Sequence, residues 1–166
     1  MSGTDAIQVS TVVDVDPDAA FELFTRDVDL WWRRGPRHRP SISGDGTMRF
    51  EGGVGGRLLE VYDQSASDAY EIGRILVWEP GARLVLDWRP RSFAVGERTE
   101  VEVRFEAEGD KTRVTVIHRG WDSIGSDHPS RHGWTGEAFT QLIGLGWAER
   151  LVSFQAGVAR KRGTAA

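Results

Sequence analysis

Hydrophobic and polar residues alternate from Ile7 to Val15, and a period of two is typical of a strand with one buried face. Asp16 and Pro17 follow this strand, and they suit the N-cap and the first position of a helix. Apolar residues then recur at helical spacing from Phe21 to Val28. We therefore predict a strand followed by a helix that ends near Trp31-Trp32, before Gly35 and Pro36.

Residues 33–47 show no apolar period and are rich in Arg, Pro, Gly and Ser, which predicts a long loop. Short runs typical of strands follow this loop, and turn residues separate each run from the next. The connections are too short to hold crossover helices, so we expect an antiparallel meander. The predicted strands are Met48–Glu51, Arg57–Asp63, Ala69–Trp78, Arg83–Trp88, Thr99–Glu106 and Thr112–His118.

The last segment, about Thr135 to Arg162, has apolar residues at steps of three or four and predicts a long amphipathic helix. Gly144 and Gly146 weaken its middle by about 1 kcal/mol each relative to alanine, so we expect this helix to approach a bulky neighbour closely. Only the long helix can cover the apolar face of the sheet. We therefore predict an α+β fold, in which a curved antiparallel sheet wraps around the C-terminal helix as one domain over residues 1–166.

The composition is that of a folded globular protein, since 39% of the 166 residues are hydrophobic and 28% are charged. The net charge of -4 argues against nucleic acid as a partner. No apolar run approaches the roughly 20 residues of a membrane span, and the N-terminus lacks a signal-peptide pattern. The chain has no cysteine, which excludes disulfides and thiolate chemistry. We expect a cytoplasmic location.

The sequence has seven tryptophans and only two tyrosines, more tryptophan than the hydrophobic core of a domain of this size usually contains. Trp88 ends its strand with the parity of Leu84 and Leu86, so it should face the interior. Two interpretations stay open, namely bulky core residues or an aromatic cage around a flat or apolar ligand. The tryptophans that we place at strand ends and element junctions, around the mouth of a pocket, are Trp32, Trp78, Trp88, Trp121 and Trp134.

His118 shares the parity of Val114 and Val116, so it should point toward the inner face of the sheet. It is either a hydrogen-bonding or general-base residue at the pocket mouth or a structural histidine that closes the strand. His132, just before the last helix, is the second histidine that we place at the pocket. No nucleophile with a base partner is apparent, so we name no catalytic residue.

Other polar clusters carry weaker signals. The histidines and aspartates between residues 118 and 132 could supply metal ligands, but their spacing matches no metal motif. We therefore expect neither a metal nor a cofactor. The basic segment Arg33–Arg39 is either an anion site built from guanidinium groups or a solvated loop.

Several segments, each loose alone, occur in one order along nearly the whole chain. They are Trp31-Trp32, Phe50-Glu51-Gly52-Gly53, Gly73–Trp88, Thr112–His118 and His132-Gly133-Trp134. In this order and spacing they resemble the START-like (SRPBCC) superfamily, specifically the branch named after the activator of Hsp90 ATPase homologue. The resemblance implies the helix-grip fold, with a hydrophobic cavity between the sheet and the long helix.

This superfamily hosts several functions on one fold, so the resemblance implies three. The first is binding of a small apolar, lipid-like or aromatic ligand in the cavity. The alternatives are a polyketide-cyclase-like or hydrolase-like enzyme with a pocket histidine, and an activator of an Hsp90-type chaperone ATPase. The eukaryotic activators have a separate N-terminal domain that this sequence does not show, so the chaperone function ranks last. A homodimer is a further candidate assembly.

Overall fold

The structure is a computed structural model that describes residues 6–35, 37–39, 45–63, 67–89, 93–125, 127–131, 133–134 and 136–165. Strands and helices occupy most of these residues. The elements are β1 (Ile7–Val13), α1 (Pro17–Thr25), α2 (Val28–Trp31), β2 (Thr47–Phe50), β3 (Arg57–Val61), β4 (Ala69–Glu79), β5 (Arg83–Trp88), β6 (Thr99–Glu108), β7 (Lys111–Arg119) and α3 (Gly136–Ala165), with two short 3-10 turns at Trp121–Ser123 and Pro129–Arg131.

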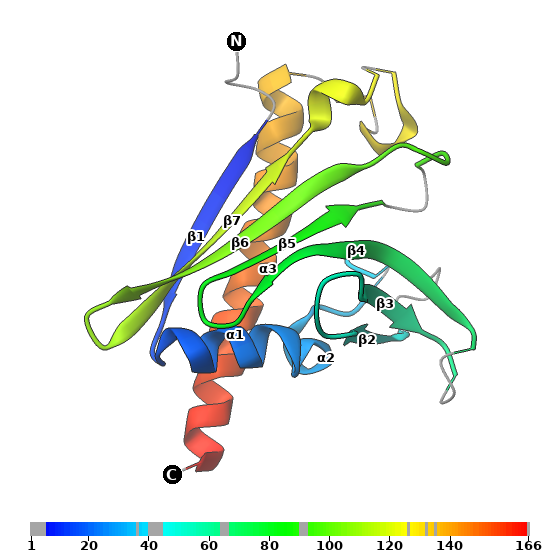
Figure 1. Ribbon diagram of the computed structural model, residues 1–166. Helices are drawn as coiled ribbons and strands as arrows, with labels where there is room; N and C mark the ends of the chain where they lie inside the picture. The colour runs from blue at the N-terminus through cyan, green and yellow to red at the C-terminus, as the bar shows by residue number, and fades with distance from the viewer. Residues whose placement is uncertain are drawn as a thin grey trace.

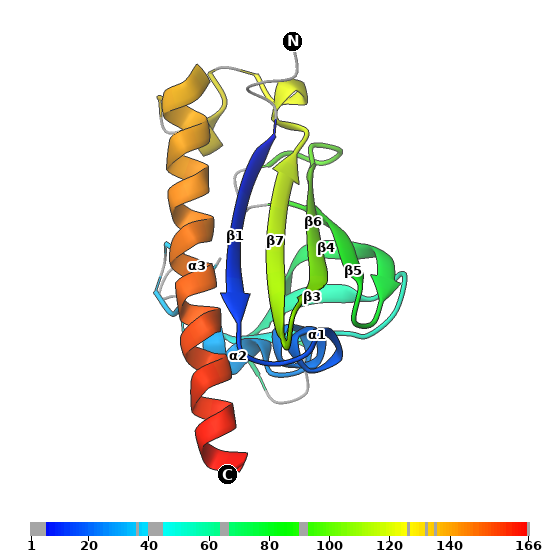
Figure 2. The same ribbon diagram turned by 90° about the vertical axis from the view of Figure 1, so that its left-hand side faces the viewer.

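The strands form one curled antiparallel sheet with the order β1-β7-β6-β5-β4-β3-β2 (Figure 1). The strands β2 to β7 are a meander, and β1 closes the order by pairing with β7. The helix α3 runs along β1 and extends past α1 and α2, which lie at one end of the sheet (Figure 2). The predicted α+β helix-grip architecture is therefore confirmed.

The first helical region is two helices rather than the single helix predicted. Its start is as predicted, because the Asp16 carboxylate accepts a hydrogen bond from the Ala19 N–H at 2.8 Å and Pro17 takes the first helical position. The helix α1 then stops at Thr25, whose hydroxyl donates to the carbonyl of Phe21 at 2.8 Å. Such a bond from a side chain to the preceding turn competes with the regular backbone ladder.

The glycines of α3 allow close approach of its backbone to two other elements. A Cβ on Gly144 would lie 3.2 Å from Ile7 of β1, so the expected close neighbour exists there. A Cβ on Gly146 would meet the flexible Arg150 side chain at 3.5 Å. Gly157 has the tightest position, because its Cβ would lie 2.9 Å from Cβ of Trp31. The helix is thus fitted against both β1 and α2.

The two faces of the sheet differ sharply along β6. Val101 and Val103 point inward and are buried, whereas Glu102 points outward beneath Arg104 and Arg119. Burial alone would raise the pKa of Glu102, but hydrogen bonds from Arg104 at 2.8 Å and Arg119 at 2.6 Å hold this pKa at about 2. The outer face is thus an ion-pair network and the inner face is the core.

Arg39 fixes the described part of the long loop. Its guanidinium is buried and donates to the carbonyls of Trp32 at 2.6 Å and Gly46 at 2.5 Å, and to the carboxylate of Asp29 at 2.6 Å. This arginine is therefore neither solvated nor available to an external anion. It holds Trp32 in place at the edge of the interior.

No described helix combines the length and the apolar character needed to cross a bilayer.

Candidate functional site: an aromatic cluster under the long helix

Five aromatic side chains meet between the sheet and α3. We call them the aromatic cluster, and its members are Trp32 after α2, Trp88 of β5, His118 of β7, Trp121 of the first 3-10 turn and Trp147 of α3. The ring centroids of Trp88 and Trp147 lie 5.3 Å apart, those of Trp32 and Trp88 lie 5.9 Å apart, and those of His118 and Trp121 lie 4.9 Å apart. Such distances are typical of favourable aromatic packing.

His118 connects β7 to α3 through both ring nitrogens. Its Nδ1 lies 3.0 Å from Nε1 of Trp147, and its Nε2 lies 2.7 Å from the hydroxyl of Thr99. Because an indole N–H can only donate, Nδ1 must accept, and a neutral His118 carries its proton on Nε2. Burial, with a smaller effect from Arg150, lowers the pKa of His118 to about 3. The ring is therefore neutral near pH 7, and neither nitrogen is spare.

Arg150, which is half-buried, stacks on two rings of this cluster. Its guanidinium carbon lies 4.9 Å from the ring centroid of Trp147 and 5.3 Å from that of Trp32, so cation–π attraction holds it. Burial lowers the pKa of Arg150 to about 10, which keeps the side chain charged near pH 7. Among the described residues it has no carboxylate ion-pair partner, and its buried Nε has no hydrogen bond.

Trp121 carries a second unpaired donor. Its ring packs 4.9 Å from His118 and 4.9 Å from Phe139, and its buried Nε1 has no acceptor among the described residues. A buried donor without a partner costs about 1–3 kcal/mol. The cluster thus contains two donors whose hydrogen bonds the described part of the chain does not complete.

The other residues that we placed at the pocket lie elsewhere. Trp78 faces the core opposite Leu84 of β5, because a register shift between Ile75 and Val77 brings it to that face. It packs edge-on against Phe21 of α1, with ring centroids 5.1 Å apart, at the other end of β5 from Trp88. Trp134 is 50% exposed. His132 lies outside the described residues.

Sequence reasoning missed two residues of this site, Trp147 and Arg150. Trp147 lies on the apolar stripe that predicted the long helix, and Arg150 follows it at a spacing of three residues, which places both on one helix face. That spacing was the available signal. The rotation of α3 that turns this face toward His118 depends on tertiary packing.

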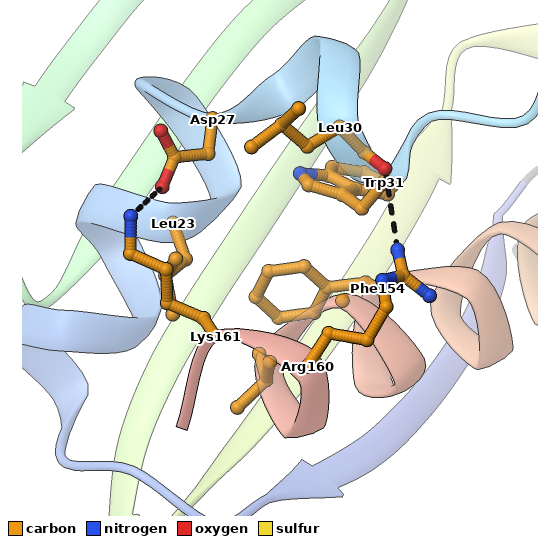
Figure 3. A pocket seen from close by; sticks show the side chains of 9 residues that line it. Leu23, Asp27, Leu30, Trp31, Phe154, Arg160 and Lys161 are labelled. Carbon is orange, nitrogen blue, oxygen red and sulfur yellow. Dashed lines mark hydrogen bonds and ion pairs between the residues drawn. The ribbon is translucent and has the colours of Figure 1, made fainter. Parts of the chain in front are cut away.

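Two pockets lie outside the aromatic cluster. One apolar pocket of about 310 Å³ is lined by α1, α2 and the C-terminal half of α3 (Figure 3), and we call it the α2–α3 pocket. A more polar pocket of about 540 Å³ lies between the start of α2 and the β2–β3 pair. No group of histidine, aspartate and glutamate side chains with metal-binding geometry occurs in the part of the chain that the structure describes.

The family of the chain follows from its sequence profile. The profile of the family described as "Activator of Hsp90 ATPase homolog 1-like protein" matches residues 14–144. The chain belongs to this family. No curated protein matches the chain.

Solved structures share the fold of this chain. Protein NE0264 from Nitrosomonas europaea has a TM-score of 0.65 at 13% identity, over 98% of this chain and 99% of that chain. PFC0360w, an HSP90 activator from Plasmodium falciparum, has a TM-score of 0.57 at 18% identity, over 86% and 87%. The Aha1 dimer from Colwellia psychrerythraea has a TM-score of 0.58 at 14% identity, over 92% and 95%. At these identities the likeness concerns the fold alone.

Proposed function

We propose that this chain binds a small aromatic molecule that carries a negative charge or another hydrogen-bond acceptor, and that the site is the aromatic cluster with Arg150. The observation that carries this proposal is the half-buried cation Arg150, whose Nε is buried. Arg150 lies on two indole rings, has no carboxylate within ion-pair distance among the described residues, although the Glu149 carboxylate is near enough to raise its pKa, and leaves its Nε without an acceptor. An acceptor on a ligand would satisfy this donor in a poorly solvated place, where a charge-assisted hydrogen bond is strong.

The rings of the cluster suit a flat ligand. Trp88 is only half-buried, whereas Trp32 and Trp147 are buried. In the proposed complex Trp88 moves outward, and a planar molecule stacks on Trp147 in its place. The Trp121 Nε1 offers a second donor at the far end of the cluster. This arrangement accounts for the unpaired donors and for the excess of tryptophan together.

Binding is better supported than catalysis. A general base needs a free nitrogen and a pKa near the working pH. His118 uses both nitrogens in hydrogen bonds to Trp147 and Thr99, and its pKa of about 3 lies well below neutrality. This histidine positions the Trp147 ring instead of moving a proton, so an enzyme that depends on it is the weaker proposal.

A thermal-shift series tests the proposal. Naphthalene-2-carboxylate should raise the melting temperature of the wild type, whereas neutral naphthalene should raise it less because it offers no acceptor to Arg150. Trp88→Ala should remove the shift, while Trp134→Ala, which changes an exposed tryptophan outside the cluster, should keep it. The proposal fails if aromatic acids give no shift at any concentration, or if Trp88→Ala and the wild type respond equally.

A second candidate is stimulation of an Hsp90-type ATPase. It rests on the family of the chain and on the likeness of its fold to PFC0360w, an HSP90 activator. The test is the ATPase rate of the Hsp90 homologue from the same organism, measured with rising amounts of this chain. A saturable rise in rate supports the function, and an unchanged rate at saturating chain contradicts it.

A further inference from the structure

The α2–α3 pocket shares no lining residue with the aromatic cluster and is a candidate second binding site. Its lining is mostly apolar and comes from three helices, with Leu23 from α1, Leu30 and Trp31 from α2, and Phe154 and Val158 from α3 (Figure 3). Its volume of about 310 Å³ falls at the lower end of the range of small-molecule pockets, roughly 300–1,000 Å³. A slender ligand fits these dimensions better than a bulky one.

Gly157 and Leu30 shape this pocket. Gly157 lines it at the point where a Cβ would lie 2.9 Å from Cβ of Trp31, so a larger residue there would displace α2. Leu30 remains 68% exposed at the pocket edge, although burying a leucine side chain away from water is favourable. An apolar ligand in the pocket would cover this side chain.

The charges at the pocket define the end group of such a ligand. Lys161 and Asp27 form an ion pair at 3.6 Å on one side of the apolar residues, and Arg160 lies on the other side (Figure 3). Arg160 donates to the carbonyl of Leu30 at 3.3 Å, and it has no carboxylate partner among the described residues. The pocket therefore has a net positive charge, and the charge without a counterion belongs to Arg160.

We propose that the α2–α3 pocket binds an unbranched alkyl carboxylate of medium chain length. The alkyl chain lies against Leu30 and Phe154, and the carboxylate binds the Arg160 guanidinium, whose fork of N–H donors suits a carboxylate. An alkylammonium of the same length would bring a second positive charge to Arg160, while the carboxylate of Asp27 is paired with Lys161. The pocket is thus expected to prefer the acid.

Calorimetric titration of the intact chain tests this site, with decanoate, butyrate and decyltrimethylammonium as probes. Decanoate should bind with one molecule per chain, and both other probes should bind more weakly. Arg160→Gln should weaken decanoate binding about tenfold. Lys161→Gln is the matched control on the next residue, and it should change the affinity less because Asp27 already compensates Lys161. Equal affinity for the acid and the ammonium, or equal effects of the two substitutions, would overturn the proposal.

Leu30→Glu provides a second variant that should fold, because this side chain is exposed. It should abolish measurable decanoate binding, whereas Leu145→Glu, at a 55% exposed leucine of α3 outside the pocket, should leave it intact. Trp88→Ala should also leave decanoate binding intact, which separates this site from the aromatic cluster. The proposal is refuted if decanoate does not bind, if Trp88→Ala rather than Leu30→Glu removes it, or if the apolar edge proves to be a dimer contact that Leu30→Glu dissociates without any effect of decanoate.

Discussion

Arg150 in the N-terminal half of α3 and Arg160 in the C-terminal half have different surroundings. Arg150 is packed on the rings of Trp32 and Trp147, and its Nε is buried without an acceptor. Arg160 lies beside the open α2–α3 pocket and donates to the carbonyl of Leu30. The region around Arg150 has a buried donor without an acceptor on packed rings, and the region around Arg160 has an open pocket beside an exposed cation. Substitutions of the buried rings around Arg150 should therefore change stability and binding together, and those around Arg160 should change binding alone.

The largest expected effect is the loss of Trp147. Trp147→Ala should lower the free energy of unfolding by about 3–5 kcal/mol, because it leaves a cavity in the core and removes the donor to His118. Chemical denaturation measures this change. Trp134→Ala, at the half-exposed tryptophan, should cost less than about 1 kcal/mol. Equal costs for the two substitutions would remove the basis for treating the cluster as the core of the site.

The next effect is the dependence of stability on pH. The pKa of His118 in the folded chain is about 3, so between pH 6.5 and 3 the unfolded chain binds the proton and the folded chain does not. Stability should therefore fall as the pH drops through this window, by up to about 1.4 kcal/mol per pH unit from this group. His118→Gln should flatten the curve of unfolding free energy against pH. Parallel curves for wild type and variant would show that His118 is not buried in its neutral form.

Substitution of Arg150 should have a smaller effect on the free energy of unfolding, and the change should be neutral or stabilising. Arg150→Met keeps the packing on Trp32 and Trp147 and removes the unpaired buried donor, so the unfolding free energy should stay the same or rise by about 1 kcal/mol. Urea denaturation of both proteins gives the difference. A loss of more than about 1 kcal/mol would mean that Arg150 serves the fold and needs no ligand.

The smallest effect on stability is expected at the α2–α3 pocket. Leu30→Glu should change the unfolding free energy by less than about 0.5 kcal/mol, because the substituted side chain is mostly in water. The same denaturation experiment measures it. A clearly destabilised Leu30→Glu would show that the pocket edge contributes to the core, and the contrast between the two halves of α3 would not hold.

Strand periodicity predicted much of this molecule. It placed Trp88 and His118 on the inner face, since side chains alternate along a strand, and both rings contact Trp147 of α3. Periodicity alone left the face of Trp78 open, because Arg74 has the same parity; the bulge in β4 shifts that parity and brings Trp78 to the core face, and no residue type signals the bulge. Local sequence rules hold within one element and end where the backbone becomes irregular.

The parts of the site that depend on contacts between elements could not be predicted. Arg39 is one of many arginines in the sequence, and only its bonds to Trp32 and Gly46 distinguish it. Arg150 likewise follows the apolar stripe of α3, but its position on two rings depends on how that helix rotates against the sheet. The α2–α3 pocket forms because Gly157 lets α3 approach Trp31, and this fit appears only when both helices are in place.

The central claim is that Arg150 is a ligand-binding cation within the aromatic cluster. The most direct test is calorimetric titration of naphthalene-2-carboxylate into the wild type, Arg150→Met and Arg26→Met, an exposed arginine whose loss changes the net charge equally. The wild type and Arg26→Met should bind one molecule per chain with similar affinity, and Arg150→Met should bind about tenfold more weakly. Equal affinities in all three proteins, or no saturable binding to the wild type, would contradict the claim.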